Sequence, residues 1–283
     1  MNINNIKKIG FEILKNADIY NIQFEISCLI CEALNISKIE FIKKNLNLNS
    51  LQIKKCVNYF RRRADNEPLQ YIIGKCEFMS LMFKNNNHVL IPRQDTETLV
   101  QLIIKNFENK SCIILDIGTG SGCIAASLAY YLKNSFIYAL DVSDKALNVA
   151  KENFKNLGVE NKIKIIKHDI LKCFPKIEEK INIVVSNPPY IESENIKKLK
   201  NEIKNYEPTI ALDGGSDGLV FYKKIISGID VDNEVFVAFE VGFNQAQNVK
   251  KIMEKKLINV FIKKDLSGFE RVVMGTYKPI CNC

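Results

Sequence analysis

Hydrophobic residues in the first part of the chain recur at the spacing of helices. Between residue 1 and about residue 70, apolar positions such as Ile6, Ile9 and Ile13 are three or four residues apart. Ser37 is followed three residues later by Glu40, the pattern of a capping box at a helix start. A later helix, over about residues 51–65, must end before Pro68. These patterns predict a small bundle of four short helices.

The pattern changes after about residue 110, where short apolar runs alternate with helical patterns. Such alternation predicts an α/β domain, in which a mostly parallel sheet has helices on both faces. The predicted strands are residues 112–117, 136–140, 163–166, 181–185, 235–241, 260–263 and 271–277. The predicted helices are residues 123–132, 146–157, 218–226 and 245–256.

The stretch between these two regions predicts a β-hairpin and one further helix. Residues 77–83 and 89–91 look like strands joined by a turn at Asn85–Asn87. A helix is predicted over residues 99–107, with Asp95 or Thr96 as its cap. We expect the hairpin to link the helical bundle to the α/β domain.

Polar or glycine residues follow four successive predicted strands. They are Gly118, Asp141, Asp169 and Asn187, and ligands bind at the carboxyl ends of the strands in sheets of this kind. The loop at residues 116–122 has the spacing G-x-G-x-G and not the G-x-G-x-x-G of pyrophosphate binders. Asp141 lies about 20 residues further on, where a carboxylate can accept from ribose hydroxyls. This arrangement predicts a nucleoside cofactor, while Asp169 is either an acceptor for an adenine amino group or a surface acid.

The sequence Asn187-Pro188-Pro189-Tyr190 directly follows an apolar strand. Two prolines make the segment stiff and remove two backbone donors, so it is rich in acceptors. The Asn187 side-chain oxygen and the Pro188 carbonyl can hold a flat, conjugated NH2 group, beside which Tyr190 can place its ring. Holding that nitrogen and opposing its growing positive charge would accelerate its attack on an electrophile. The alternative is an ordinary turn after a strand.

Composition adds few constraints. The 283 residues carry a net charge of +8 and are 47% hydrophobic, which is typical of a globular protein. No apolar run approaches the ~20 residues of a membrane helix, and we expect a cytoplasmic protein. The lysines are spread over the chain, although Arg61–Arg63 form either a solvated helix face or a partner site. His88 and His168 are each isolated in the sequence.

The nine cysteines are scattered, which predicts reduced thiols and not a disulfide framework. Cys28 and Cys31 form a C-x-x-C pair, and Cys281 and Cys283 lie close together at the end of the chain. A structural zinc site needs four ligands, and no second suitable pair accompanies the first. We therefore predict core packing for Cys28 and Cys31, and no metal.

Several of these stretches resemble known enzymes. The loop Asp116–Gly122 resembles the cofactor loop of class I methyltransferases, which bind S-adenosylmethionine, and Asn187–Tyr190 resembles the motif of those that methylate amide or exocyclic amino nitrogens. Residues 68–74, 91–97 and 206–208 narrow the resemblance to the release-factor glutamine methyltransferases, the HemK/PrmC family. The resemblance covers nearly the whole chain. The family usually has Pro where this chain has Gln94.

The resemblance implies methylation of the side-chain amide nitrogen of glutamine in the Gly-Gly-Gln motif of bacterial release factors 1 and 2. It implies a Rossmann-like class I methyltransferase domain at residues 93–283, a helical substrate-recognition domain at 1–70 and a hairpin linker at 71–92. Catalysis would involve Asn187, Pro188 and Tyr190, and substrate binding these residues with Pro189 and Arg93. Cofactor contacts would come from Gly118, Thr119, Gly120, Ser121, Gly122, Asp141, Asp169 and Asn187.

Three alternatives remain open at the level of the sequence. The target could be a glutamine of a ribosomal protein, or an amino group of adenine in DNA or guanine in RNA. The chain could also be a non-catalytic S-adenosylmethionine-binding protein, although such a protein would not need the intact Asn-Pro-Pro-Tyr motif. For the main hypothesis we expect a monomer with no membrane association and no stable nucleic-acid partner.

Overall fold

The computed structural model describes residues 1–43 and 46–279, which form two compact units. The first unit comprises residues 1–75 together with the short segment Lys200–Tyr206. The second comprises Cys76–Leu199 and the chain from Glu207 onward. The division near residue 75 follows a glycine, Gly74, in the left-handed region (φ +77°) that ends a helix.

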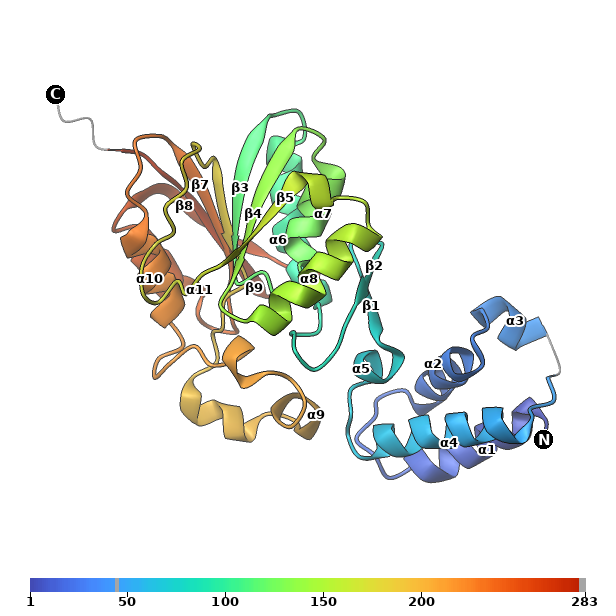
Figure 1. The fold of residues 1–283 in the computed structure, drawn as a ribbon. Coiled ribbons are helices and arrows are strands. Elements are labelled where there is room, and N and C mark those ends of the chain that lie inside the picture. The colour runs from blue at the N-terminus through green and yellow to red at the C-terminus, as the bar shows by residue number, and fades with distance from the viewer. Residues whose placement is uncertain (44–45, 280–283) are drawn as a thin grey trace. The chain divides into compact units, whose positions relative to one another are not determined.

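The first unit is helical, as the spacing of its apolar residues predicts (Figure 1). Its core is formed by apolar side chains that include Ile6, Leu29 and Phe60. Ser37 and Glu40 form the predicted capping box, with each side chain accepting from the other residue's backbone N–H at 3.1 Å. The helices are α1 (Ile3–Leu14), α2 (Ile22–Leu34), α3 (Lys38–Lys43), α4 (Ser50–Ala64), α5 (Leu69–Ile73) and α9 (Asn201–Lys204).

The arginine run on α4 is mostly engaged in ion pairs inside the first unit. Arg63 is buried and pairs with Glu25 at 2.5 Å and with Glu202 at 3.1 Å. Arg62 pairs with Glu67, and Arg61 is exposed. Of the two interpretations of this run, a solvated face therefore fits Arg61 alone.

The cysteine pair of the first unit lies along α2, where Cys31 is buried and Cys28 half-buried. Burial raises the pKa of both thiols, as expected for core residues. Cys281 and Cys283 lie outside the described residues. In the described part of the chain, no group of three or more His, Cys, Asp or Glu side chains could hold a metal ion. Nor is any helix there long and apolar enough to cross a membrane.

The second unit contains a seven-stranded sheet in the order β5-β4-β3-β6-β7-β9-β8, which confirms the predicted mostly parallel sheet. Strands β3 to β7 pair in parallel, and β9 pairs antiparallel with both β7 and β8. The strands are β3 (Cys112–Ile117), β4 (Ser135–Asp141), β5 (Ile163–Lys167), β6 (Ile183–Ser186), β7 (Val235–Glu240), β8 (Leu257–Lys264) and β9 (Glu270–Tyr277).

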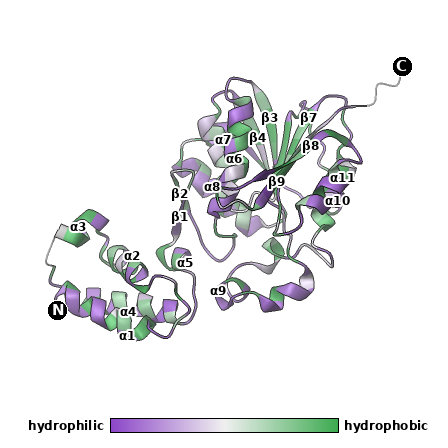
Figure 2. Ribbon diagram, turned by 180° about the vertical axis from the view of Figure 1, so that it is seen from behind, coloured by the Kyte–Doolittle hydropathy of each residue, from purple (hydrophilic) through white to green (hydrophobic). Residues whose placement is uncertain are grey.

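Helices cover both faces of this sheet (Figure 1). The strands between them are apolar on both sides, so their hydrophobic runs are nearly continuous (Figure 2). Strand β8, at the sheet edge, is largely exposed and ends in two lysines, which discourages further strand pairing. One face carries α6 (Gln94–Phe107), α7 (Cys123–Tyr131) and α8 (Asp144–Asn156), and the other carries α10 (Val220–Gly228) and α11 (Ala246–Met253).

The predicted hairpin exists, but its turn and both strands were placed wrongly, since the predicted first strand, residues 77–83, runs through the observed turn. It consists of β1 (Lys75–Phe78) and β2 (Leu81–Lys84), and its turn is Met79–Ser80, with φ values of +51° and +58°. Two positive φ values are those of the tight turn that best matches strand twist. Strand β2 ends at Lys84, where the side chain of Asn153 bonds both backbone groups at 2.7 and 3.0 Å, and the predicted second strand at residues 89–91 is not formed.

The predicted cap of the helix before β3 is also wrong. Helix α6 begins earlier, at Gln94, and Arg93 is its cap residue without a side-chain hydrogen bond. Gln94 thus occupies the first helical position, where proline is also favoured, so the departure from the family pattern leaves the helix start intact. Asp95 and Thr96 lie within the first turn and make tertiary contacts instead.

Candidate active site

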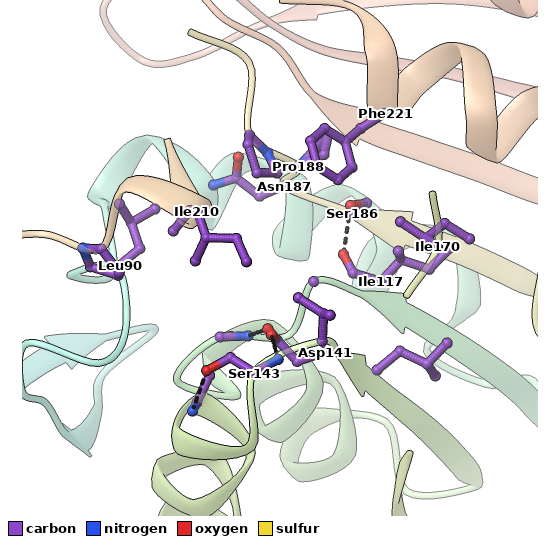
Figure 3. Close-up of a pocket in the computed structure, with 18 of the residues that line it drawn as sticks. Leu90, Ile117, Asp141, Ser143, Ile170, Ser186, Asn187, Pro188, Ile210 and Phe221 are labelled. Atoms are coloured by element: carbon purple, nitrogen blue, oxygen red, sulfur yellow. Dashed lines mark hydrogen bonds between the residues drawn. The ribbon is translucent and has the colours of Figure 1, made fainter. Parts of the chain in front are cut away.

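A cavity of about 240 Å³ opens at the carboxyl ends of β3, β4, β5 and β6 in the second unit. Asp141 lies on one side of it, and Asn187 and Pro188 lie on the opposite side (Figure 3). Most of the remaining wall is apolar. It is contributed by Leu90, Ile117, Leu140, Ile170, Ile210 and Phe221. A mostly apolar cavity with a few convergent polar groups is typical of a cofactor site.

The glycine loop after β3 contributes two of its three glycines to the wall. Gly118 and Gly120 line the cavity with φ values of +75° and +55°. A Cβ on Gly118 would have no heavy atom within 4 Å, so the space in front of its backbone is open. Gly122 does not line the cavity; a Cβ there would come within 2.4 Å of the Phe154 ring. The absence of a side chain at Gly122 therefore permits close packing of α7 against α8.

Thr119 and Ser121 point into the protein and do not line the cavity. The Thr119 hydroxyl donates to Asp116 Oδ2 at 2.6 Å, and the Ser121 carbonyl accepts from Asn153 Nδ2 at 2.9 Å. Asp116 is fully buried, and burial raises its pKa to about 7. Its Oδ1 has no hydrogen-bond partner among residues 1–43 and 46–279. Nothing in the sequence pattern set Asp116 apart, although it is the first residue of the glycine loop.

Asp141 ends β4 and shapes the glycine loop as well as the cavity. Its Oδ2 accepts from the Gly120 N–H and its Oδ1 accepts from the Ser143 N–H, each at 2.9 Å. Burial raises the pKa of this carboxyl, and the backbone donors partly offset that effect. Each carboxylate oxygen keeps a second lone pair, so Asp141 can still accept from two hydroxyl groups in the cavity.

Asp169 lines the same cavity from the loop after β5, and its Oδ1 accepts from the Leu171 N–H at 3.0 Å. The two histidines that are isolated in the sequence, His88 and His168, also contribute to the wall. His168 Nε2 lies 2.8 Å from the Cys173 carbonyl oxygen. Asp169 therefore shares a cavity with Asp141, and its role as an acceptor for an adenine amino group stays a prediction.

Asn187 and Pro188 form the side of the cavity opposite Asp141 (Figure 3). Asn187 Nδ2 donates to the Thr96 hydroxyl oxygen at 3.2 Å. No described residue donates a hydrogen bond to Asn187 Oδ1. The strand before this segment is fixed to β3, because the Ser186 hydroxyl donates to the Ile117 carbonyl at 2.6 Å. Asn187 thus presents an unused acceptor at a fixed position.

Tyr190 and Arg93 do not line the cavity, although Tyr190 directly follows Pro189, which does. The Tyr190 ring lies close to Gly242, where a Cβ would come within 2.8 and 3.2 Å of two of its ring carbons. Arg93 forms an ion pair with the buried carboxyl of Glu207. Burial, followed by the charge of Glu240, raises the pKa of the Tyr190 phenol to about 12, so the phenol stays neutral.

Three glycines and one glutamine hold the Asn-Pro-Pro-Tyr segment in place, and none of the four stood out in the sequence. A Cβ at Gly214 or Gly218 would come within 2.7 or 2.4 Å of the Tyr190 backbone. Gln245 Nε2 donates to the Tyr190 carbonyl at 2.8 Å, and its Oε1 accepts from the Gly242 N–H at 3.1 Å. Spacing along the chain gave no sign of these contacts, because Tyr190 and Gln245 are 55 positions apart.

Taken together, the groups that line this cavity fit the adenosine part of S-adenosylmethionine. A carboxylate with free lone pairs, an open glycine backbone and apolar walls suit a ribose and an adenine ring, and no pyrophosphate cradle is present in the described loop. The second acid, Asp169, adds an acceptor.

Comparison with known proteins assigns the chain to a family. Residues 92–224 match the family described as "Methyltransferase small domain", and residues 8–74 match "PrmC N-terminal domain". The fold resembles the crystal structure of the hMettl16 catalytic domain, with a TM-score of 0.54 at 17% identity over 80% of this chain and 83% of that one.

Curated relatives match over most of their length. The "Release factor glutamine methyltransferase" of Clostridium acetobutylicum is 39% identical over 79% of this chain and 80% of its own. The protein of the same name from Clostridium botulinum is 36% identical over 93% and 95%. The one from Thermodesulfovibrio yellowstonii is 38% identical over 87% and 89%. The chain therefore belongs to the release factor glutamine methyltransferase family and is an S-adenosylmethionine-dependent methyltransferase with the class I fold.

Proposed function

We propose that this protein methylates the side-chain amide nitrogen of the glutamine in the Gly-Gly-Gln motif of release factors 1 and 2, with S-adenosylmethionine as methyl donor. We further propose that it acts in the cytoplasm as a monomer. The names of its relatives support the substrate. The geometry that carries the proposal is the fixed, unused acceptor Oδ1 of Asn187 at the wall of the cavity.

S-adenosylmethionine supplies a methyl group bonded to a positively charged sulfur. As the amide nitrogen of the substrate bonded to that methyl carbon, the carbon–sulfur bond would break and leave its electron pair on the sulfur. The nitrogen would gain the positive charge and would give up one proton to water as the product leaves. Asn187 Oδ1 and the Pro188 carbonyl accept from the two N–H groups of the substrate amide. Because this charge grows along the reaction, both acceptors stabilise the transition state more than the ground state.

On the opposite side, Asp141 would hold the ribose and Asp169 the adenine amino group, while Gly118 and Gly120 allow the backbone to approach the cofactor. We propose that Tyr190 packs on the plane of the substrate amide and that Arg93 takes part in substrate binding, the roles that the resemblance implies. Pro208 and Ile210, which follow Glu207, line the cavity and would exclude water.

For the rest of the chain we propose the division made from the sequence: a release-factor-recognition domain at residues 1–70, a linker at 71–92 and a catalytic domain at 93–283. The match of residues 8–74 to the PrmC N-terminal domain supports a dedicated first domain.

The test is transfer of radiolabelled methyl from S-adenosylmethionine to bacterial release factors 1 and 2. Each factor is supplied with its Gly-Gly-Gln motif intact or with Gln replaced by Ala, and duplex DNA, ribosomal RNA and ribosomal proteins are supplied in parallel. We expect label in the intact factors and none in the Ala variants. Label that enters only nucleic acid or a ribosomal protein would replace this proposal with one of the alternative substrates.

A further inference from the structure

We propose that Thr96 and Glu240 are positioning residues, which fix the side-chain amide of Asn187 with its oxygen toward the substrate nitrogen and strengthen that oxygen as an acceptor. The proposal rests on the proposed function, because it assigns Asn187 Oδ1 to the substrate amide. Neither residue lines the cavity, and neither is part of the Asn-Pro-Pro-Tyr motif.

The three residues come from separate elements that the fold brings together. Strands β6 and β7 pair in parallel with Ser186 opposite Phe239, so the next residues, Asn187 and Glu240, leave the sheet side by side. Thr96 lies in the first turn of α6, and its hydroxyl oxygen accepts from Asn187 Nδ2 at 3.2 Å. A hydrogen bond from the Thr96 side chain lowers the pKa of the Glu240 carboxyl and so favours its ionised form.

The orientation of the Asn187 amide follows from the chemistry of this chain of groups. When Glu240 is ionised its carboxylate can only accept, so the Thr96 hydroxyl must then donate its one proton to Glu240. The hydroxyl oxygen can then only accept from Asn187, which must turn its NH2 group toward Thr96. Asn187 Oδ1 is left to face the other way, as a substrate acceptor requires. Without Thr96, either end of the amide could face the substrate at similar cost.

Burial makes this constraint strong. Thr96 is 2% exposed and Glu240 is 1% exposed, so water cannot replace either partner. A buried polar group that loses its hydrogen-bond partner is destabilised, and a charged group more so. Glu240 Oε2 has no hydrogen-bond partner in the described part of the chain. The carboxyl therefore depends strongly on the hydroxyl of Thr96.

The negative charge of Glu240 also acts on the reacting nitrogen through the same chain. Hydrogen bonds in series polarise one another, so donation toward an anion shifts electron density to Asn187 Oδ1. The titratable groups facing Glu240 are Arg93 and Asp95 at the start of α6, Arg271 on β9, Tyr190 after β6 and Tyr222 on α10. The arginines favour the ionised form, whereas burial and Asp95 oppose it and raise the pKa of Glu240 to about 7.

The experiment compares full-length variants for methylation of an intact release factor at saturating S-adenosylmethionine, together with the cofactor Kd from calorimetry. Thr96→Val keeps the shape and removes the hydroxyl, so we expect kcat to fall about tenfold with the cofactor Kd changed by less than about threefold. Thr96→Ser keeps the hydroxyl and should restore most of kcat. Thr98→Val makes the same change at a half-buried position of α6 and should leave both unchanged.

The pH profile distinguishes positioning from simple structural support. In the wild type, kcat should rise with pH through about 7 as Glu240 ionises. Glu240→Gln can still accept from Thr96 but carries no charge, so its kcat should be several-fold lower and flat between about pH 6 and pH 8. The Thr96→Ser variant should keep the wild-type profile.

Two results would overturn the positioning role alone: a Thr96→Val enzyme with kcat within twofold of an active wild type, or a Thr96→Ser enzyme as impaired as Thr96→Val. A wild-type protein that transfers no methyl group to any release factor would overturn the proposed function, and this inference with it. Thermal unfolding of each variant identifies any loss of activity that is caused by misfolding. If Thr96→Val is misfolded, the activity of Thr96→Ser decides between a positioning role and simple structural support.

Discussion

Asp141→Asn isolates the contribution of a single carboxylate to cofactor binding. In the wild type, each oxygen of Asp141 accepts from a different backbone N–H, of Gly120 and of Ser143, at 2.9 Å. Asparagine has only one carbonyl oxygen, so its NH2 group must face one of these two donors. The variant therefore loses one backbone hydrogen bond and half of its acceptors for the ribose.

The expected size follows from these contacts. A hydrogen bond to a charged group contributes about 1.5–3 kcal/mol, and about 1.4 kcal/mol changes a binding constant tenfold. The affinity for S-adenosylmethionine should therefore fall about 10- to 100-fold. The free energy of unfolding should fall by less than the binding free energy. Burial raises the pKa of Asp141, so removing its charge recovers part of the desolvation cost.

The assay is calorimetric titration of wild type and variant with S-adenosylmethionine, accompanied by thermal unfolding of the cofactor-free proteins. Asp144→Asn is the matched control, because Asp144 is an exposed residue of α8 whose ion pair with Lys167 is also exposed. It should bind the cofactor like wild type. An Asp141→Asn protein that binds within twofold of wild type would refute the role of Asp141 as the ribose acceptor.

Three further predictions concern the site and its supports. Asn187→Ala should lower kcat about 10²-fold by removing one preorganised group, with little change in cofactor Kd; near-normal turnover would contradict its role. Gly122→Ala should lower the free energy of unfolding in urea by about 2–4 kcal/mol, because it adds left-handed backbone strain and a clash with Phe154. Gly158→Ala should cost only the strain, because its surroundings are open. Equal losses in the two variants would refute the clash. Burial raises the pKa of Asp116 and Glu240 to about 7, so near neutral pH both hold protons in the folded state that they lose on unfolding. Tm should therefore fall as the pH rises from about 5 to about 8. A Tm that rises steadily over this range would contradict their burial.

The residues at the strand ends could be predicted because their positions follow from a general rule. Ligands of parallel sheets bind at carboxyl ends, and the sequence alone places Gly118, Asp141, Asp169 and Asn187 at four of them. The structure brings these four residues to one cavity. The order of strands in the sheet was not needed for this prediction, because any parallel order puts these ends on the same edge.

Supporting contacts could not be predicted, because they depend on which elements are neighbours. Glu240 is beside Asn187 only because β7 pairs with β6, and Thr96 reaches them only because α6 begins at Gln94. The hairpin error has a similar origin. The three asparagines at 85–87 suggested the turn, but the chain turns earlier, at Met79–Ser80, and Asn153 of α8 bonds both backbone groups of Lys84, where β2 ends.

The position of the transferred methyl group tests the central claim most directly. Release factor 2 is incubated with the protein and S-adenosylmethionine, digested, and the peptide with the Gly-Gly-Gln motif is sequenced by fragmentation mass spectrometry. The account predicts one added methyl group on the side-chain amide of that glutamine with the wild type, and its near-absence with Asn187→Ala. A methyl group on any other residue, or an equal yield from both proteins, would contradict the account.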